Sequence, residues 1–402
     1  MRAMVSMAAA LLIGGGAGAQ EARPPVPPTP VFAGPAITPE SLAGFKREAA
    51  RVLFWDQAER DANFLHMERI FPVQVVKAAA RVRPLPAGRP LAMPTAQVDA
   101  FMRDANVAGL LVLDHGRIRL ERYARGLTPD GHWASFSVAK SFTSTLVGAA
   151  IRDGFIGGVA DPVTRYIPEL AGSAYDGVTI EQILTMTSGV RWNEDYTDPD
   201  SDVVKFAAEP LVAGQDPTVS YLRRLPREAA PGTKWSYKTG ESNLIGVLVA
   251  RATRLPLANY AAARIAGPAG FERDGYWQVS GAAIGGCCLN LGLRDYGRMG
   301  QFALEDGKGQ VAPGWFDRAL SLQRTFGTDG RGYGYQWWTY PEGAAARGIY
   351  GQAIFVDRAH QIVIVMLSAW PNATDRALGE ASDDFDRKII ASIVAEKTRA
   401  RR

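Results

Sequence analysis

The sequence predicts an α+β fold in which one antiparallel sheet, built from both ends of the chain and flanked by helices, carries an inserted all-helical subdomain. An apolar run near residue 110 turns back into alternating apolar and charged residues, and a second pair of strand-like segments lies near the C-terminus. The long stretch between them has short amphipathic segments separated by Gly and Pro turns. With 402 residues, of which 47% are hydrophobic, the chain can bury a large core.

Residues 1–19 have the features of a secretory signal peptide. Arg2 precedes an apolar, small-residue run from Met4 to Ile13, and an Ala-Gly-Ala tripeptide at 17–19 offers a cleavage site before Gln20. The run is shorter than the ~20 strongly apolar residues that a membrane span needs. We therefore expect an exported protein, periplasmic or secreted, with no stable membrane span after cleavage.

The rest of the chain divides by composition and periodicity. Residues 20–40 are rich in Pro and carry no periodicity, which predicts a disordered arm. Helix-like spacing predicts a helical extension over 41–100 that packs on the main body. The main domain is expected over 101–399, with its helical subdomain at about 155–330.

Two hairpins and a closing helix define the expected sheet. The segment 108–124 is an apolar run, an Asp-His-Gly turn and an alternating strand. The segment 352–368 has the same form around a turn at 357–360, and residues 384–397 have helical spacing. A site is expected in the crevice between this sheet and the helical insert.

Charge and cysteine content exclude several classes. The net charge of +4 is spread along the chain, apart from the tail at 397–402, which argues against nucleic acid as a partner. Cys287 and Cys288 are adjacent, and because a bridge between neighbours is strained, we expect core packing to replace a disulfide framework. Nor do they form a spaced metal-ligand set.

The main catalytic candidate is a serine three residues before a lysine. The segment 135–151 has a helical apolar stripe that ends before Gly154, and Ser137 and Lys140 share one face of it. A desolvated lysine can take the serine proton, and the N–H groups at the start of a helix favour developing negative charge. Such a pair also arises by chance, so the alternative is an N-cap serine with a solvated lysine.

The surrounding motifs favour the catalytic reading. Ser137-Val-Ala-Lys140 opens an apolar helix directly after a hairpin, and the stretches 161–170, 179–189 and 231–237 follow in order. Over residues 101–394 the chain resembles the β-lactamase-related serine hydrolases. It is nearest to the class C β-lactamase and esterase branch, and most similar to the 6-aminohexanoate-dimer (nylon-oligomer) hydrolases. The resemblance implies a β-lactamase/transpeptidase-like fold.

The resemblance also implies a catalytic tyrosine at Tyr237, whose pKa a nearby ammonium could lower so that it acts as general base. The alternative is a core tyrosine bonded to the backbone. Relatives often have Tyr-x-Asn here, whereas this chain has Tyr237-Lys238-Thr239. The missing carboxamide disfavours strong β-lactamase activity.

The third family motif is expected on a strand near the C-terminus, where this chain has Tyr350-Gly351-Gln352 in place of Lys-Thr-Gly. We expect Tyr350 and Gly351 to contact substrate, and the backbone N–H groups of Ser137 and Gln352 to form an oxyanion hole. A true Lys-Thr-Gly occurs at 238–240, but it leads into a helical run and is a decoy by position.

An acidic loop at 192–202 carries Tyr196, which looks like the substrate-side tyrosine of the 6-aminohexanoate-dimer hydrolases. Its acids could attract a substrate amine, or could simply be solvated. We select only Tyr196 from this loop as a substrate-binding residue.

Other chemistries fit less well. There is no Gly-x-Ser-x-Gly motif and no His-Glu-x-x-His motif, and the scattered histidines are His66, His115, His132 and His360. The sequence therefore predicts a serine hydrolase that cleaves small-molecule amides or esters with Ser137, Lys140 and Tyr237 and needs no cofactor or metal. The alternatives are a DD-peptidase or β-lactamase type of enzyme and a degenerate, non-catalytic cell-wall-binding module. Oligomeric state cannot be read from the sequence.

Overall fold

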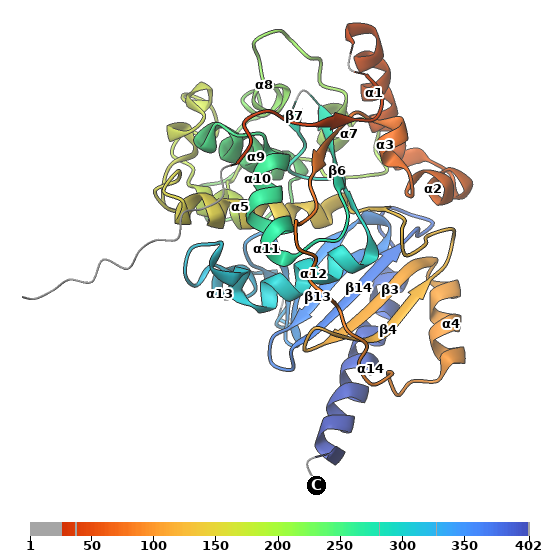
Figure 1. Cartoon of the computed structure of the whole chain (residues 1–402). Helices are drawn as coiled ribbons and strands as arrows, with labels where there is room; N and C mark the ends of the chain where they lie inside the picture. Colours follow the sequence, from red (N-terminus) through yellow and green to blue (C-terminus); the bar gives the residue numbers. More distant parts are fainter. Residues whose placement is uncertain (1–25, 37, 281, 327, 401–402) are drawn as a thin grey trace, which may run out of the picture.

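The computed structural model describes residues 26–36, 38–280, 282–326 and 328–400, so the predicted signal peptide lies outside the described residues. A large antiparallel sheet forms one lobe, and most of the helices form the other (Figure 1). Within the described residues, no helix is both long and apolar enough to cross a membrane.

The large sheet is built from both ends of the chain, as predicted. Its strand order is β4-β3-β14-β13-β12-β11-β10-β9, and every neighbouring pair is antiparallel. Its strands are β3 (Val107–Asp114), β4 (Arg117–Tyr123), β9 (Arg324–Thr325), β10 (Gly332–Tyr333), β11 (Trp338–Tyr340), β12 (Gly343–Gly348), β13 (Gln352–Asp357) and β14 (Ile362–Ser368). Both predicted hairpins, β3–β4 and β13–β14, are present, and the α+β class is confirmed.

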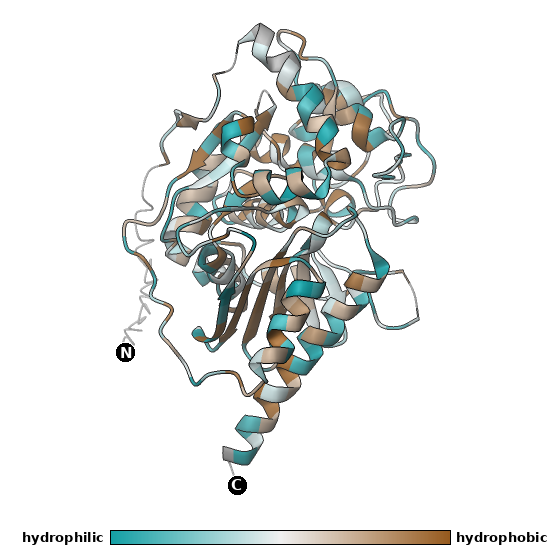
Figure 2. Ribbon diagram, turned by 90° about the vertical axis from the view of Figure 1, so that its right-hand side faces the viewer, coloured by the Kyte–Doolittle hydropathy of each residue, from teal (hydrophilic) through white to brown (hydrophobic). Residues whose placement is uncertain are grey.

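Helices cover both faces of this sheet. The helices α4 (Thr95–Asp104) and α14 (Arg376–Ala400) pack on one face through a core that includes Val98, Phe385 and Ile389. The helix α12 (Leu293–Leu304) covers the other face, where a Cβ on Gly300 would lie 2.4 Å from Val363. In Figure 2 the strands are apolar, whereas the long helix that ends at the C-terminus alternates apolar and polar residues. This helix begins earlier than the predicted 384–397, because Asp375 caps its first turn.

The predicted all-helical insert is wrong in one respect, because it contains strands of a second sheet. This sheet has the order β1-β2-β6-β8-β5, with β7 paired to β6. Its strands are β1 (Phe32–Ala33), β2 (Val73–Val76), β5 (Trp133–Ala134), β6 (Gly275–Ser280), β7 (Ala282–Ala283) and β8 (Leu289–Leu291). The N-terminal extension is therefore not purely helical, since its strand β2 pairs with β6.

The helical lobe is built around two buried helices, α5 and α9, which lie side by side. A Cβ on Gly148 of α5 would lie 2.5 Å from the Trp315 ring, so close packing there requires glycine. Apart from α1, the other helices are short. The helices of this lobe and of the N-terminal extension are α1 (Pro39–Arg51), α2 (Gln57–Asn63), α3 (Met67–Ile70), α5 (Ala139–Arg152), α6 (Ile180–Leu184), α7 (Asp202–Ala207), α8 (Pro217–Leu222), α9 (Thr239–Thr253), α10 (Leu257–Ala261), α11 (Gly267–Ala269) and α13 (Trp315–Ala319).

Part of the Pro-rich arm is ordered, contrary to expectation. The strand β1 pairs with β2, and the Asn259 side chain donates hydrogen bonds of 2.8 Å to the carbonyls of Pro27 and Thr29. These partners lie far away in sequence, so local composition could not reveal them. After the arm, α1 and the 3₁₀ turn η1 (Val52–Phe54) lie beside α7 at the edge of the helical lobe (Figure 1).

Cys287 and Cys288 are bonded to each other. Cys288 has a left-handed backbone, with φ of 70°. A bridge between neighbours closes almost no loop, so it cannot replace core packing as a source of stability. Two hydrophobic clusters occur among the described residues. The first joins the helical lobe to the α12 face of the large sheet, and the second lies under α14.

Candidate active site

Ser137 lies in η2 (Phe136–Val138), the 3₁₀ turn that leads into α5, rather than in the helix itself. Phe136 before it has φ of 43°, a strained conformation for a residue with a side chain. The turn sets Ser137 at the boundary of two cavities, with 8% of its surface exposed. Strain of this kind is common where a reactive side chain must be presented.

Lys140 contacts Ser137 as the spacing predicts. Its Nζ lies 2.8 Å from Ser137 Oγ, 2.7 Å from the Gly286 carbonyl and 3.1 Å from Thr239 Oγ1. Burial lowers the pKa of Lys140 to about 7, although the charge of Glu194 opposes this. A neutral amine here donates to Gly286 and Thr239 and has a lone pair for the Ser137 hydroxyl proton.

Tyr237 also lies at the site, but its titration is opposite to the expectation. Its ring is 5.1 Å from Lys140 Nζ, and its side chain hydrogen-bonds with Ser137. Burial and the charge of Glu194 raise the pKa of Tyr237 well above its usual value. The predicted lowering by an ammonium is therefore wrong, since burial penalises the phenolate and Lys140 itself tends to be neutral. Of the two, Lys140 is the better general base.

Glu194 is a site residue that the sequence reasoning missed. Its carboxylate accepts hydrogen bonds from the Tyr196 hydroxyl (2.7 Å), the Thr239 N–H (2.9 Å), the Thr239 hydroxyl and the Trp192 indole N–H. Thr239 thus donates to Glu194 and accepts from Lys140, which links the carboxylate to the base. The acidic loop was noticed in the sequence, but no local signal separated Glu194 from its neighbours.

The aspartates of the same loop hold its turns and do not face the site. Asp195 accepts from the Thr197 N–H, Asp198 from the Asp200 N–H, and Asp202 from the Tyr221 hydroxyl. These bonds fix the loop that carries Glu194 and Tyr196. The alternative of a structural role therefore fits these acids better than capture of a substrate amine.

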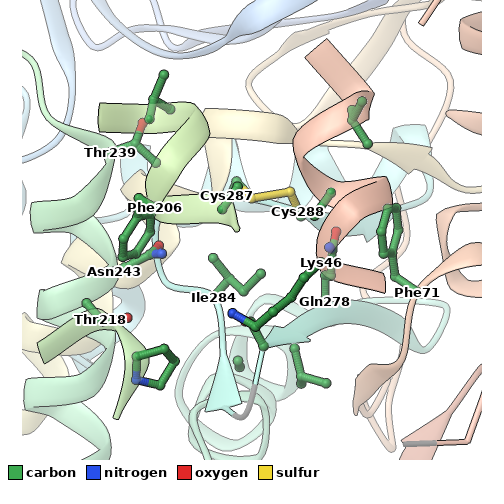
Figure 3. A pocket seen from close by; sticks show the side chains of 18 of the residues that line it. Lys46, Phe71, Phe206, Thr218, Thr239, Asn243, Gln278, Ile284, Cys287 and Cys288 are labelled. Carbon is green, nitrogen blue, oxygen red and sulfur yellow. A yellow bond between two sulfur atoms is a disulfide. The ribbon is translucent and has the colours of Figure 1, made fainter. Parts of the chain in front are cut away.

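Two cavities meet at Ser137. The first, called here the apolar cavity, holds about 150 Å³ and is lined mainly by hydrophobic side chains, with the Cys287–Cys288 disulfide in its wall (Figure 3). The second, called here the open cleft, holds about 840 Å³ and is lined by Tyr237, Glu194 and the end of β12. Tyr196, predicted to be on the substrate side, borders both. Its placement is consistent with that role.

The third-motif residues are placed differently from one another. Tyr350 is buried, and its hydroxyl donates to the Leu53 carbonyl (3.0 Å), so its side chain faces the N-terminal extension and not the substrate. Gly351 lines the open cleft with φ of +86°, and a Cβ there would lie 2.3 Å from the Trp370 ring, so only glycine fits. The prediction of substrate contact is thus wrong for the Tyr350 side chain.

Gln352 borders the open cleft, but its side chain is held internally. Its amide donates to the Ser368 carbonyl (2.7 Å) and accepts from the Trp133 indole N–H (3.0 Å). The backbone of Gly348 lies close to the nucleophile, because a Cβ there would lie 3.0 Å from the Ser137 nitrogen. The N–H of Ile349, which borders both cavities, is therefore an alternative oxyanion donor to that of Gln352.

Two further expectations concern residues near the site. Lys238 precedes α9, as predicted for a decoy, and its Nζ donates to the Ser236 carbonyl (3.1 Å), 3.8 Å from the buried Glu241 carboxylate. Its neighbour Thr239 nevertheless contacts Lys140, so the decoy tripeptide holds one site residue.

His132 has a structural role, because its Nε2 lies 2.8 Å from the Asp274 carbonyl. Among the described residues, no group of three or more His, Cys, Asp or Glu is arranged to hold a metal ion.

Replacing Glu194 with glutamine should shift the acid limb of the pH profile to lower pH. In the wild type, kcat/KM should rise with pH around 7 as Lys140 loses its proton. The negative charge of Glu194 raises the pKa of Lys140, so removing it should lower that pKa. The pH dependence of kcat/KM for a nitrophenyl ester measures this. Asp200→Asn in the same loop is the control. If the acid limb of Glu194→Gln stays at the same pH or moves to higher pH, Glu194 does not raise the pKa of Lys140.

Several known proteins are similar to this chain in sequence. Residues 95–285 match the β-lactamase family model. A 6-aminohexanoate-dimer hydrolase of Paenarthrobacter ureafaciens is 28% identical over 80% of this chain and 88% of its own length. The esterase EstB of Burkholderia gladioli is 29% identical over 44% of this chain and 49% of its own length.

Solved structures show the same fold. A Bacillus anthracis protein assigned as a 6-aminohexanoate-dimer hydrolase superposes with a TM-score of 0.71 at 20% identity, over 84% of this chain and 94% of its own. A penicillin-binding protein of Bacillus halodurans gives a TM-score of 0.57 at 15% identity, over 74% of this chain and 99% of its own. At these identities the likeness establishes the fold alone.

Proposed function

Since the chain carries a β-lactamase family domain and is a serine hydrolase of that family, we propose that it cleaves amide or ester bonds through an acyl-enzyme. In this proposal Ser137 is the nucleophile, and Lys140 and Tyr237 form the proton-transfer pair. The observation that carries it is the buried amine of Lys140, which lies 2.8 Å from Ser137 Oγ and has a pKa of about 7. A group that is half neutral near pH 7 suits a general base.

The proposed reaction has two halves. Ser137 Oγ attacks the carbonyl carbon, and its proton passes to Lys140 Nζ. The N–H groups of Ser137 and of Ile349 or Gln352 stabilise the oxyanion. The leaving amine or alcohol takes the proton through the Tyr237 hydroxyl, and a water molecule then attacks the acyl-enzyme with Lys140 again as base.

The ranking of substrates depends on two family-motif residues that this chain lacks. The position after Tyr237-Lys238 holds Thr239 rather than an asparagine, and Tyr350 replaces the third-motif lysine. These changes favour amides of the 6-aminohexanoate-oligomer kind or small esters over β-lactam antibiotics and D-Ala-D-Ala peptides. Retention of Ser137, Lys140 and Tyr237 together argues against a non-catalytic binding module.

Labelling with a fluorophosphonate probe tests the proposal. The wild type should be labelled, and Ser137→Ala should not. A substrate panel with a short nitrophenyl ester, a linear 6-aminohexanoate oligomer, a D-Ala-D-Ala peptide and a chromogenic cephalosporin should show turnover of the ester or the oligomer. Absence of both labelling and turnover in folded protein would sink the hydrolase proposal, and dominant cephalosporin turnover would reverse the ranking.

Export is a separate proposal that depends on residues 1–19. Expression in a Gram-negative host should give a mature protein in the periplasm or the medium that begins at Gln20. N-terminal sequencing measures this directly.

A further inference from the structure

The apolar cavity is open to Ser137 at its mouth and is walled by three separate parts of the chain. The α1 and η1 segment, the α7 region and the β6–β8 region each supply hydrophobic side chains. These are Phe45, Ala49, Val52, Leu53, Val203, Phe206, Ala207, Val279, Ala283 and Ile284. Phe136, Ser137 and Ile349 all line the cavity, so a group bonded to the carbonyl that Ser137 attacks can enter it.

One wall of this cavity lies outside the family domain. The helix α1 and the turn η1 span residues 39–54, well before the start of the matched region at 95. Val52 is buried in the core, and Phe45 and Ala49 pack against the same cluster. The N-terminal extension therefore helps to enclose the reaction site.

The polar groups of the cavity wall are mostly engaged within the protein. Lys46 Nζ donates to the Glu209 carbonyl, and Asp216 accepts from the Thr218 N–H (2.9 Å) at the start of α8. Asn243 Oδ1 accepts from the Gly286 N–H (2.5 Å). These groups leave a mainly apolar interior (Figure 3), in which an added charge would be costly.

We propose that the apolar cavity binds an uncharged, apolar arm of the substrate, about six carbons long, and that α1 and η1 help to set this preference. The inference depends on the proposed hydrolase function. A dry cavity of ~150 Å³ is large enough to bind benzene, which has six carbons. The apolar cavity has about the same volume, 150 Å³. The arm belongs either to the acyl group or to the leaving group, since both are bonded to the carbonyl that Ser137 attacks.

Two ester series identify the arm and measure its length. The first series has nitrophenyl esters from acetyl to decanoyl, and the second has acetate esters of alcohols from ethyl to decyl. Each buried methylene should raise kcat/KM roughly fourfold, so the four extra methylenes of a six-carbon arm should gain about 200-fold over a two-carbon arm in one of the series. The gain should stop at about six carbons. No gain with chain length in either series, or a gain that continues to ten carbons, overturns the inference.

A charged arm is the second comparison. Hexanoyl nitroanilide should be cleaved at least tenfold faster than 6-aminohexanoyl nitroanilide, because the cavity is apolar and Lys46 lines it. Faster cleavage of the ammonium-bearing compound would overturn the uncharged character of the arm.

Variants test the contribution of α1. Ala49→Trp fills the cavity from α1, so the ratio of six-carbon to two-carbon kcat/KM should fall at least tenfold. Arg47→Trp, on the exposed side of the same helix, is the matched control and should leave that ratio and the rates unchanged. Ala283→Leu narrows the cavity from β7 and should lower the same ratio if Ala49→Trp does not fold. An unchanged ratio in folded Ala49→Trp or Ala283→Leu overturns the inference.

Different results would reject the hydrolase function and the apolar arm of the substrate. If no ester is cleaved and the fluorophosphonate does not label Ser137, the hydrolase function itself fails. If the two-carbon esters are cleaved and the label attaches, but chain length has no effect in either series, only the apolar arm is rejected.

Discussion

Replacing Lys140 with methionine should lower kcat/KM about 10³-fold or more, because general base catalysis is worth about 10² to 10⁴ in rate. Methionine keeps the length of the side chain but cannot accept the Ser137 proton. The measurement is steady-state turnover of a nitrophenyl ester. Lys234→Met is the control, since that lysine is half-exposed and pairs with Glu228. A rate within tenfold of the wild type would remove Lys140 from the mechanism.

The same substitution should stabilise the protein at acidic pH. The folded pKa of Lys140 is lowered to about 7, against 10.5 for a free lysine. Between these values the unfolded chain binds more protons, so the free energy of unfolding of the wild type should rise with pH from about 7 to 10.5. Below pH 7 the full cost of burying the charge is present, and Lys140→Met removes it.

Chemical denaturation at pH 6 and pH 9 checks the sign. The stability of Lys140→Met relative to the wild type should be higher at pH 6 than at pH 9. The hydrogen bonds to Gly286 and Thr239 are lost at both pH values and partly offset the gain. An equal stability difference at the two pH values would contradict the lowered pKa of Lys140.

The part of the site that could be predicted is the part that is local in sequence. Ser137 and Lys140 are three residues apart, and turn and helix geometry brings them together whatever the rest of the chain does. Only the tertiary fold brings Thr239 and the Gly286 carbonyl to Lys140, and Glu194 to Thr239. Their residue types are common in loops and at helix starts, so no pattern marked them.

The fold was predictable to the same extent. The strands of the two hairpins are six to eight residues long and mostly apolar or alternating, which is a strong local signal. The second sheet was missed because β1, β5 and β7 have two residues each, too few to show a period. Its pairing also joins distant segments, such as Val73 opposite Gln278.

The burial of Tyr237 decides what its hydroxyl can do. Since its pKa is raised, Tyr237 stays neutral at the pH where Lys140 titrates, and it can only relay a proton that the lysine has taken. Its ring stacks on Trp338 with centroids 5.5 Å apart, and phenylalanine can keep that contact. Tyr237→Phe therefore removes the relay with little change in packing.

Tyr237→Phe should lower kcat/KM about 10²- to 10³-fold and leave the acid limb near pH 7, because that limb belongs to Lys140. If Tyr237 were the general base, its loss would instead change the shape of the profile. The pH dependence of kcat/KM for the same ester distinguishes the two roles. Tyr333→Phe is the control, because its ring lies 6.2 Å from that of Tyr237 in the same aromatic cluster. A near-normal rate in Tyr237→Phe would leave Lys140 to return the proton alone.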